Sequence, residues 1–356
     1  MTERRPPEPD RRTDDLGALD AIERAELRQM CKAYEGAVAR QSLWQLANSF
    51  LPFFAICGLM YWSLGVSFLL TAALAVVAAG LVVRIFVIQH DCGHGAFFRA
   101  RWANELVGML CSLVTLTPYL LWRRQHAGHH SHWNNLDQRL AGIDIYSGCL
   151  TVAEYEALSP LRRRWLRVLQ HPVTAWLVLP PAVFLLLYRT PFDAPRAWRR
   201  ERRGVYLTNL GLVGLVLGLG FSLGFRSVAL VQLPVIAIAA TIGVGLFSVQ
   251  HRFERSLWAR AGVWNNVSAS LEGSSYLQLP RVLQWFTGNI GFHHVHHLNP
   301  RIPNYRLQAC HAAIPALHSV HVLTPWQALR AWRAALWDEG NARMVPFAKA
   351  FAARQK

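Results

Sequence analysis

The sequence predicts an all-α integral membrane protein, in which four transmembrane helices form two hairpins. The chain has 356 residues, is 53% apolar and carries a formal net charge of +16. Its apolar residues gather in blocks near the length that spans a bilayer, and its arginines gather between those blocks. Tight histidine clusters stand beside the apolar blocks. The same pattern predicts interfacial or re-entrant helices beside the four crossings.

The four predicted crossings come in two pairs that are separated by very short turns. The first pair is residues 43–64 and 66–89, and the second is residues 205–225 and 227–250. An even number of crossings returns the chain to its starting side, so every histidine cluster falls on one side of the membrane. Arg84 lies near the end of the second crossing, where we expect its side chain to snorkel toward water.

Two further apolar segments are short and contain proline. Residues 106–122 include Pro118, and residues 173–188 include Pro180 and Pro181. Their length suits a helix that lies in the interface or dips partly into it. Arginines flank residues 173–188 on both sides, which predicts that both ends of this segment stay cytoplasmic.

The chain ends and their boundaries are predicted from composition. We expect residues 1–42 to be a cytosolic N-terminal segment, disordered up to residue 20 and then an amphipathic helix. Residues 43–325 would form the membrane domain with its cap, and residues 326–356 a cytosolic tail. No short apolar signal segment is present near the start, so the first membrane helix would direct insertion.

Charge and cysteine usage exclude several classes of protein. Arginines between apolar blocks are typical of cytoplasmic loops at an anionic leaflet. Nucleic-acid binding is disfavoured, because no soluble fold that reads nucleic acid is visible. The six cysteines have no paired spacing, which argues against a disulfide framework or a zinc ribbon and fits a reduced cytosolic face.

The histidine clusters have the spacing that places side chains on one face of a helix, three or four residues apart. Imidazole binds iron, copper and zinc. Eight such ligands are too many for one mononuclear site, and a structural zinc needs only four. A two-metal centre follows, with iron favoured because oxygen activation beside a membrane suits it. His251 leaves the fourth crossing at the same depth and adds a ninth ligand. The candidate ligands are His90, His94, His126, His129, His130, His251, His293, His296 and His297.

Nearby polar residues are candidates for supporting roles. Asp91, Asp137 and Asp144 could hold the second ring nitrogens of the ligands, and Asn289 could reach a metal directly or through water. Each of these residues is equally compatible with a capping or surface role. The remaining histidines lack the placement of the clusters and receive no metal role; they are His132, His171, His294, His311, His318 and His321.

Several motifs together resemble the membrane fatty acid desaturase family, over roughly residues 40–325. The three histidine boxes are residues 90–94 (His-Asp-Cys-Gly-His), 122–130 (Trp-Arg-Arg-Gln-His-Ala-Gly-His-His) and 291–298 (Gly-Phe-His-His-Val-His-His-Leu). The first box, residues 249–254 and residues 273–280 are similar to the acyl-lipid omega-6/omega-3 branch. Residues 302–305 (Ile-Pro-Asn-Tyr) resemble its bacterial members. One departure is the Ser131-His132 pair, which makes His132 a possible rival ligand.

The resemblance implies a non-haem diiron centre at the cytosolic ends of four crossings, held by the nine candidate histidines and covered by a cytosolic helical cap. The implied reaction uses O2 and introduces a cis double bond into a membrane-lipid acyl chain. No cytochrome b-type haem domain is evident, so electrons would come from a separate ferredoxin or cytochrome-type carrier. The implied location is a bacterial inner membrane, with the active site on its cytoplasmic side.

Two other functions remain open at this point. An alkane or carotenoid hydroxylase or ketolase would share the histidine ligands, and only the motifs outside the histidine boxes favour a desaturase. A metal transporter would need polar groups near the middle of its crossings. The crossing interiors are nearly free of ionisable residues, which disfavours transport.

Overall fold

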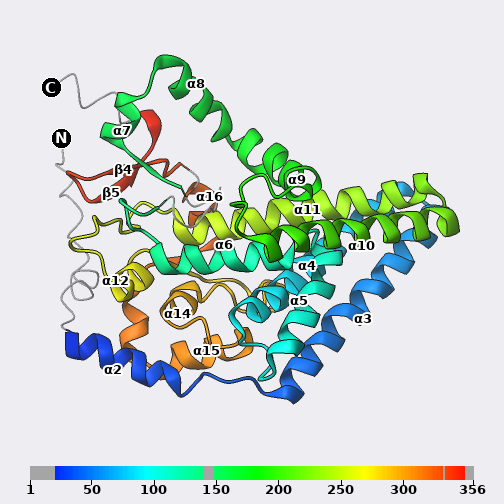
Figure 1. Ribbon diagram of the computed structural model, residues 1–356, viewed down its shortest axis with the longest axis horizontal. Coiled ribbons are helices and arrows are strands. Elements are labelled where there is room, and N and C mark those ends of the chain that lie inside the picture. Colours follow the sequence, from blue (N-terminus) through cyan, green and yellow to red (C-terminus); the bar gives the residue numbers. More distant parts are fainter. Residues whose placement is uncertain (1–20, 140–147, 332, 349–356) are drawn as a thin grey trace, which may run out of the picture.

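The computed structural model describes residues 21–139, 148–331 and 333–348 (Figure 1). Within these ranges, four helices are long and apolar enough to cross a membrane. They are α3 (Ala39–Ser63), α4 (Phe68–His94), α10 (Arg199–Leu223) and α11 (Phe225–His251). α3 pairs with α4 and α10 with α11, and all four run through the right-hand half of Figure 1. The predicted pair of hairpins is therefore confirmed, although the predicted disorder of residues 1–20 lies outside the described residues.

α4 is the central helix of the bundle and carries the first histidine cluster on its last turn. In its most apolar stretch 61% of residues are buried, against 17% in α10. The helix runs past the predicted end at residue 89, because nothing interrupts its backbone hydrogen bonds before Gly95. Gly95 has φ 68°, and its N–H bonds the carbonyl of Asp91, the left-handed glycine cap that commonly ends a helix.

Arg84 does not reach water as predicted. Its side chain is only 6% exposed and its Nε donates to Ser49 Oγ at 3.0 Å. The guanidinium also donates to the carbonyl of Trp285 and lies 4.1 Å from the centre of that ring. These partners replace the water that snorkelling would have supplied, so Arg84 ties α3 and α4 to the cap.

The two short apolar segments are bent, not straight spans. α5 (Arg101–Thr115) and α6 (Tyr119–His132) meet at 102°, at Leu116 with φ 58°. α8 (Pro160–Leu169) meets the segment of η1 (Val173–Val178), α9 (Leu179–Leu185) and η2 (Leu187–Arg189) at 56°. The described parts of the chain thus have four candidate spans, or six if each bent pair crosses. Either number is even, as the predicted topology requires.

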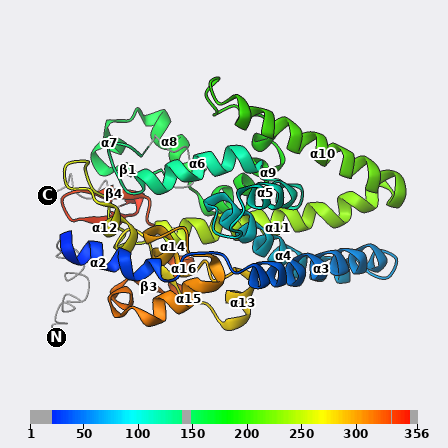
Figure 2. The same ribbon diagram turned by 60° about the horizontal axis from the view of Figure 1, so that its bottom comes forward.

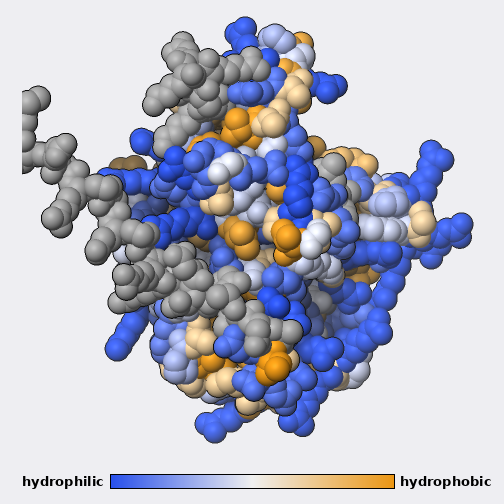
Figure 3. Space-filling view, turned by 90° about the vertical axis from the view of Figure 1, so that its left-hand side faces the viewer, coloured by the Kyte–Doolittle hydropathy of each residue, from blue (hydrophilic) through white to orange (hydrophobic). Residues whose placement is uncertain are grey.

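The cap consists of short elements at the left of Figure 1, in the half opposite the four long helices, an arrangement that Figure 2 also shows. Seen from this end, its surface is mostly hydrophilic (Figure 3). The helical elements are α2 (Ala21–Lys32), α7 (Val152–Ala157), α12 (Asn266–Leu271), α13 (Arg281–Phe286), α14 (His293–Leu298), α15 (Asn304–Ala313), η3 (Pro315–Ser319) and α16 (Pro325–Ala331). The strands are β1 (Leu150–Thr151), β2 (Tyr276–Leu277), β3 (Val322–Leu323), β4 (Leu336–Asp338) and β5 (Arg343–Val345).

Two small sheets join parts of the cap that are far apart in sequence. β4 pairs in parallel with β1 and antiparallel with β5, and β2 pairs in parallel with β3. Residues 336–345 therefore pack against residues 150–151. The cap is otherwise helical, as predicted, and the division of the chain at residues 42 and 325 stays a prediction.

Gly108 allows α5 to approach α6, and its replacement should destabilise the protein. A Cβ at this position would overlap the ring of Tyr119, which is 1% exposed and donates through its hydroxyl to the Cys92 carbonyl at 2.8 Å. We expect Gly108→Val to lower the free energy of unfolding by about 1–3 kcal/mol or more. Thermal unfolding of detergent-purified protein measures this. Gly214→Val is the control, since a Cβ there meets no atom within 4 Å; equal unfolding temperatures for both variants would contradict this packing.

Candidate metal centre

Four elements bring the predicted histidines to one place. His90 and His94 leave the last turn of α4, with ring centres 4.7 Å apart. The 102° bend before α6 turns that helix across the end of α4, so that His126 lies 4.8 Å from His90 between ring centres. The third cluster comes from α14 in the cap, where His296 lies 4.3 Å from His90. Residues more than two hundred positions apart are thus in direct contact.

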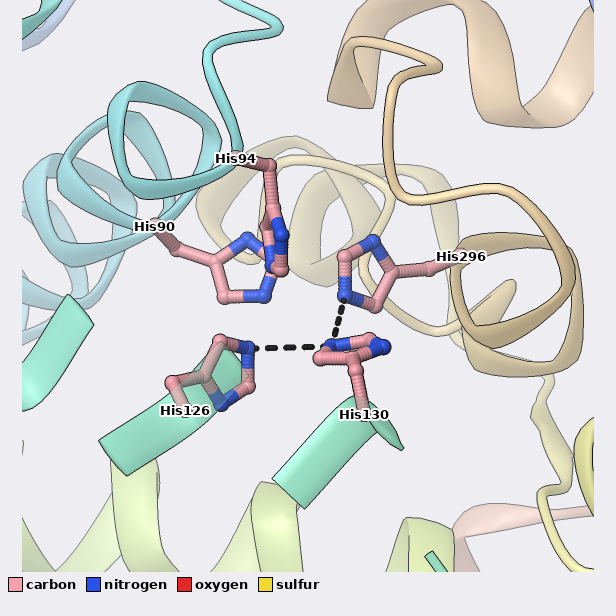
Figure 4. A group of neighbouring side chains, drawn as sticks. All are labelled: His90, His94, His126, His130 and His296. Carbon is pink, nitrogen blue, oxygen red and sulfur yellow. Dashed lines mark hydrogen bonds between the residues drawn. The ribbon is translucent and has the colours of Figure 1, made fainter. Parts of the chain in front are cut away.

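The rings of five histidines point toward one another and form one group (Figure 4). Their ligand atoms all lie within 4.8 Å of one another. His130 Nε2 is 3.1 Å from His126 Nε2 and 3.0 Å from His296 Nε2. The group consists of His90, His94, His126, His130 and His296. Five nitrogen donors at one point form a site capable of holding a metal ion.

A second group lies beside the first and is centred on His251, the last residue of α11. His251 Nε2 is 3.2 Å from His129 Nε2 and 3.0 Å from His293 Nε2. The ligand atoms of His129, His251 and His297 all lie within 4.8 Å of one another. His293 joins this group through its contact with His251. All nine predicted histidines therefore converge, five around one point and four around another.

The donor atoms in both groups fit a metal. His94 Nε2 in the first group and His297 Nε2 in the second are buried and have no hydrogen-bond partner in the described parts of the chain. A buried polar atom without a partner destabilises the fold by roughly 1–3 kcal/mol. A metal ion in each group would accept these lone pairs and remove that penalty.

Burial keeps these imidazoles neutral, which is the form that binds a metal. Burial lowers the pKa of His129 to about 3. It also lowers the pKa of His126, His130 and His296 well below the usual value, and neighbouring imidazoles lower it further. Their lone pairs are therefore available at neutral pH.

Aromatic side chains shield the histidines from water. The Trp122 ring stacks on His126 with ring centres 4.6 Å apart, and Trp133 lies 4.0 Å from the His251 ring. Trp133 is held by a hydrogen bond from its Nε1 to the Gly273 carbonyl at 3.1 Å. The site is consequently a dry one, in which polar contacts are stronger than in water.

Asp91 is the predicted supporting carboxylate that does lie beside a candidate ligand. Its Oδ1 is 3.4 Å from His90 Nδ1, and its Oδ2 accepts from Asn304 N at 2.7 Å and Asn304 Nδ2 at 2.8 Å. Asn304 is held in turn by Gln45, whose Nε2 donates to Asn304 Oδ1 at 2.9 Å. Asp91, Asn304 and Gln45 are all buried. Neither Asn304 nor Gln45 was predicted, although Asn304 lies in the Ile-Pro-Asn-Tyr motif.

The other supporting residues lie elsewhere. Asn289 donates its amide to the Asn304 carbonyl at 3.2 Å. His132 Nδ1 lies 3.1 Å from the Gly128 carbonyl, and His132 belongs to neither metal-competent group. Asp137 is exposed and accepts from Arg260 Nη1 at 2.7 Å. Asp144 lies outside the described residues. Among the described residues, Asn289 and Asp137 thus have hydrogen-bond partners other than the candidate ligands.

An apolar cavity opens onto the centre from the membrane side. His90, His126 and His293 line its inner end, and the walls come from α4, α9 and α11. Val82 of α4 and Ala239 of α11 lie far from the histidines along their helices and are both buried. A linear apolar molecule in this cavity would lie against the imidazoles.

Four apolar helices form a bundle that ends at two groups of histidines beside an apolar cavity. This arrangement defines a membrane protein with histidine clusters capable of binding metal. The sequence model of the family described as "Fatty acid desaturase" matches residues 66–329. The chain belongs to the fatty acid desaturase family and is accordingly an oxidoreductase.

Three relatives illustrate the extent of the similarity. A "Fatty acid desaturase" of Bacillus subtilis (strain 168) is 43% identical over 327 residues, 92% of each chain. An "sn-1 oleoyl-lipid 12-desaturase" of Anabaena variabilis is 26% identical over 270 residues, 72% of each chain. A chloroplastic "Omega-6 fatty acid desaturase" of Arabidopsis thaliana is 26% identical over 238 residues, 65% of this chain and 50% of that one. The predicted family and its acyl-lipid relatives are confirmed.

Proposed function

We propose that the chain binds two iron ions and, with O2 and an external electron donor, introduces a cis double bond into an acyl chain of a membrane lipid. The observation that carries this proposal is the convergence of nine histidines, seven of them buried and His94 and His130 partly buried, at the inner end of an apolar cavity. In the first group His90, His94, His126, His130 and His296 would hold one iron. In the second His129, His251, His293 and His297 would hold the other.

Iron and O2 would supply the oxidising power to break unactivated C–H bonds, which no side-chain base can do. In the balanced reaction, O2 takes two hydrogens from adjacent carbons together with two electrons and two protons. The products are one double bond and two molecules of water. The protein binds the acyl chain, orients it and excludes water.

The cavity can orient an acyl chain by shape. Phe86 and Val87 of α4 and Phe247 of α11 line the cavity within four residues of His90 or His251, so apolar side chains would hold the reacting carbons. The head-group end of the lipid substrate would remain near Gln125 and Asp193. These two residues line the same cavity and are joined by a 2.8 Å hydrogen bond. Carbons at a fixed distance from the head group would then lie beside the histidines.

The proposed orientation places the centre on the cytoplasmic side of a bacterial inner membrane. The arginines on both sides of the re-entrant segment favour that side, and the hydrophilic face of the cap would meet the cytosol (Figure 3). A ferredoxin or cytochrome-type carrier would deliver electrons there, aided by the positive charge of the chain.

Fatty acid profiling tests the proposal. The chain is expressed in a host that lacks its own desaturases and is supplied with a ferredoxin system. We expect new cis-unsaturated acyl chains in the membrane lipids by mass spectrometry. Hydroxylated or ketonic chains in their place, or an unchanged profile with iron-loaded protein in the membrane, would contradict it.

Asp91→Asn should weaken iron binding without unfolding the protein. The amide keeps the size of the carboxylate but removes the negative charge beside His90 Nδ1. Loss of such a partner typically lowers metal affinity by about 10–100-fold. The rate at which a chelator removes iron from purified protein measures the change. Asp137→Asn, at an exposed carboxylate paired with Arg260, is the matched control, and equal chelation rates for both variants would refute the role of Asp91.

A further inference from the structure

One stripe of side chains runs along the wall that α11 contributes to the cavity, with Ala239, Val244 and Leu246 beside it. Ile236, Ala240, Gly243, Phe247 and Gln250 line the cavity and recur every three or four residues, which places them on one face of the helix. The stripe is bulky near the histidines and small in its middle. The smallest side chains of the stripe are therefore at Ala240 and Gly243.

Helix packing does not require a glycine at residue 243. A Cβ built at Gly243 meets no atom within 4 Å, although the residue lies inside a long helix where glycine is unfavourable by about 1 kcal/mol relative to alanine. Gly245 gives the contrast, since its Cβ would lie 3.0 Å from the Trp176 ring. Packing against η1 explains Gly245, whereas the space beside Gly243 belongs to the cavity.

The position of Gly243 along α11 indicates which end of the substrate would lie beside it. Gly243 is eight residues before His251, which is ~12 Å along the helix axis. On the histidine side the cavity reaches the surface at Phe192, which lines it and is 58% exposed, next to Asp193 of the polar pair with Gln125. The head group would stay at that opening, so the apolar stretch along α11 would receive the methyl end of the chain.

We propose that Gly243 is a specificity-determining residue, which leaves room for the part of the acyl chain between the new double bond and the methyl end. This inference rests on the proposed function, because it assumes that the cavity holds the acyl substrate. A larger side chain at residue 243 would shorten the available length, and only shorter acyl chains would then place their reacting carbons beside the histidines.

Two substitutions at different depths give an ordered expectation. Gly243→Leu and Ala240→Leu both project into the cavity, and residue 240 lies three positions, or ~4.5 Å, farther from the histidines. Leucine favours the helix at least as well as the residue it replaces at 243. Leucine at residue 243 would leave less room beyond the reacting carbons than leucine at residue 240. We therefore expect the longest acyl chain that is still desaturated to be shorter for Gly243→Leu than for Ala240→Leu.

The test is the chain-length distribution of unsaturated products in a host fed saturated fatty acids of increasing length. For Gly243→Leu, the ratio of short to long products should rise by roughly tenfold or more, the usual effect of adding bulk to an apolar pocket. Gly218→Leu on α10 is the matched control, because a Cβ there also meets nothing within 4 Å and the residue does not line the cavity. Its distribution should equal that of the unmodified chain.

Three results would overturn the inference. One is a Gly243→Leu distribution equal to that of Gly218→Leu, and another is a reversed order of the two cavity variants. The third concerns the milder variant Gly243→Ala, which is made in case leucine removes all activity. The inference would be wrong if this variant formed less unsaturated product at every chain length to the same extent, with its iron content unchanged. Failure of the proposed function is distinct from these, since the unmodified chain would then form no unsaturated product at all.

Discussion

His296→Ala is expected to abolish formation of unsaturated product while the protein still inserts into the membrane. His296 lies on α14 in the cap, 3.0 Å from His130 Nε2, and completes the first group from the side opposite α4. Its removal leaves four donors and a gap in a buried site. The apolar faces of the spans do not pack against the His296 ring, so insertion should be normal. Fatty acid profiling and the amount of protein in the membrane fraction measure the two effects.

His132→Ala is the control for this prediction. His132 lies on α6, two residues beyond His130, and belongs to neither metal-competent group. The control should retain product, which would also eliminate His132 as a rival ligand. Product formation by His296→Ala near the level of the control would contradict the assignment of the first group.

His251→Ala is expected to abolish product as well, and to remove roughly half of the bound iron. His251 is the residue shared by the contacts of the second group, with ring nitrogens of His129 and His293 at 3.2 and 3.0 Å. Without it the remaining donors do not surround a common point, whereas the first group keeps all five. Iron per chain in purified protein, measured by mass spectrometry of the metal, is the readout.

His311→Ala serves as the comparison for iron content. His311 Nδ1 is 3.0 Å from His294 Nε2, in a histidine contact that is separate from both groups. This variant should keep the iron content of the unmodified chain. If His251→Ala kept all of its iron, or lost all of it, the division into a group of five and a group of four would be wrong.

Much of this architecture follows from patterns that are local in sequence. Apolar length predicts the four spans, and helical spacing predicts that His90 and His94, or His126 and His130, share a face. The position of His251 directly after a span predicts its depth. These inferences need only the periodicity and length of one element at a time, which is why the structure confirms them.

The parts that were missed depend on contacts between distant elements. The support of Asp91 by Asn304 and Gln45 joins residues more than two hundred positions apart, and no local signal pairs them. Arg84 was expected in water, but Trp285 of the cap supplies its partner. Asn289 has the helical spacing from His293, yet its backbone has φ 59° and is not helical, so spacing alone does not fix where its side chain lies.

The most direct test of the central claim is the metal content and Mössbauer spectrum of the full chain, purified from iron-57-enriched cells without exposure to chelators. Nine histidines in two adjoining groups predict two irons per chain, in nitrogen-rich surroundings and close enough to be magnetically coupled. Protein that is folded and active but carries a single iron, or that carries none, would contradict the account.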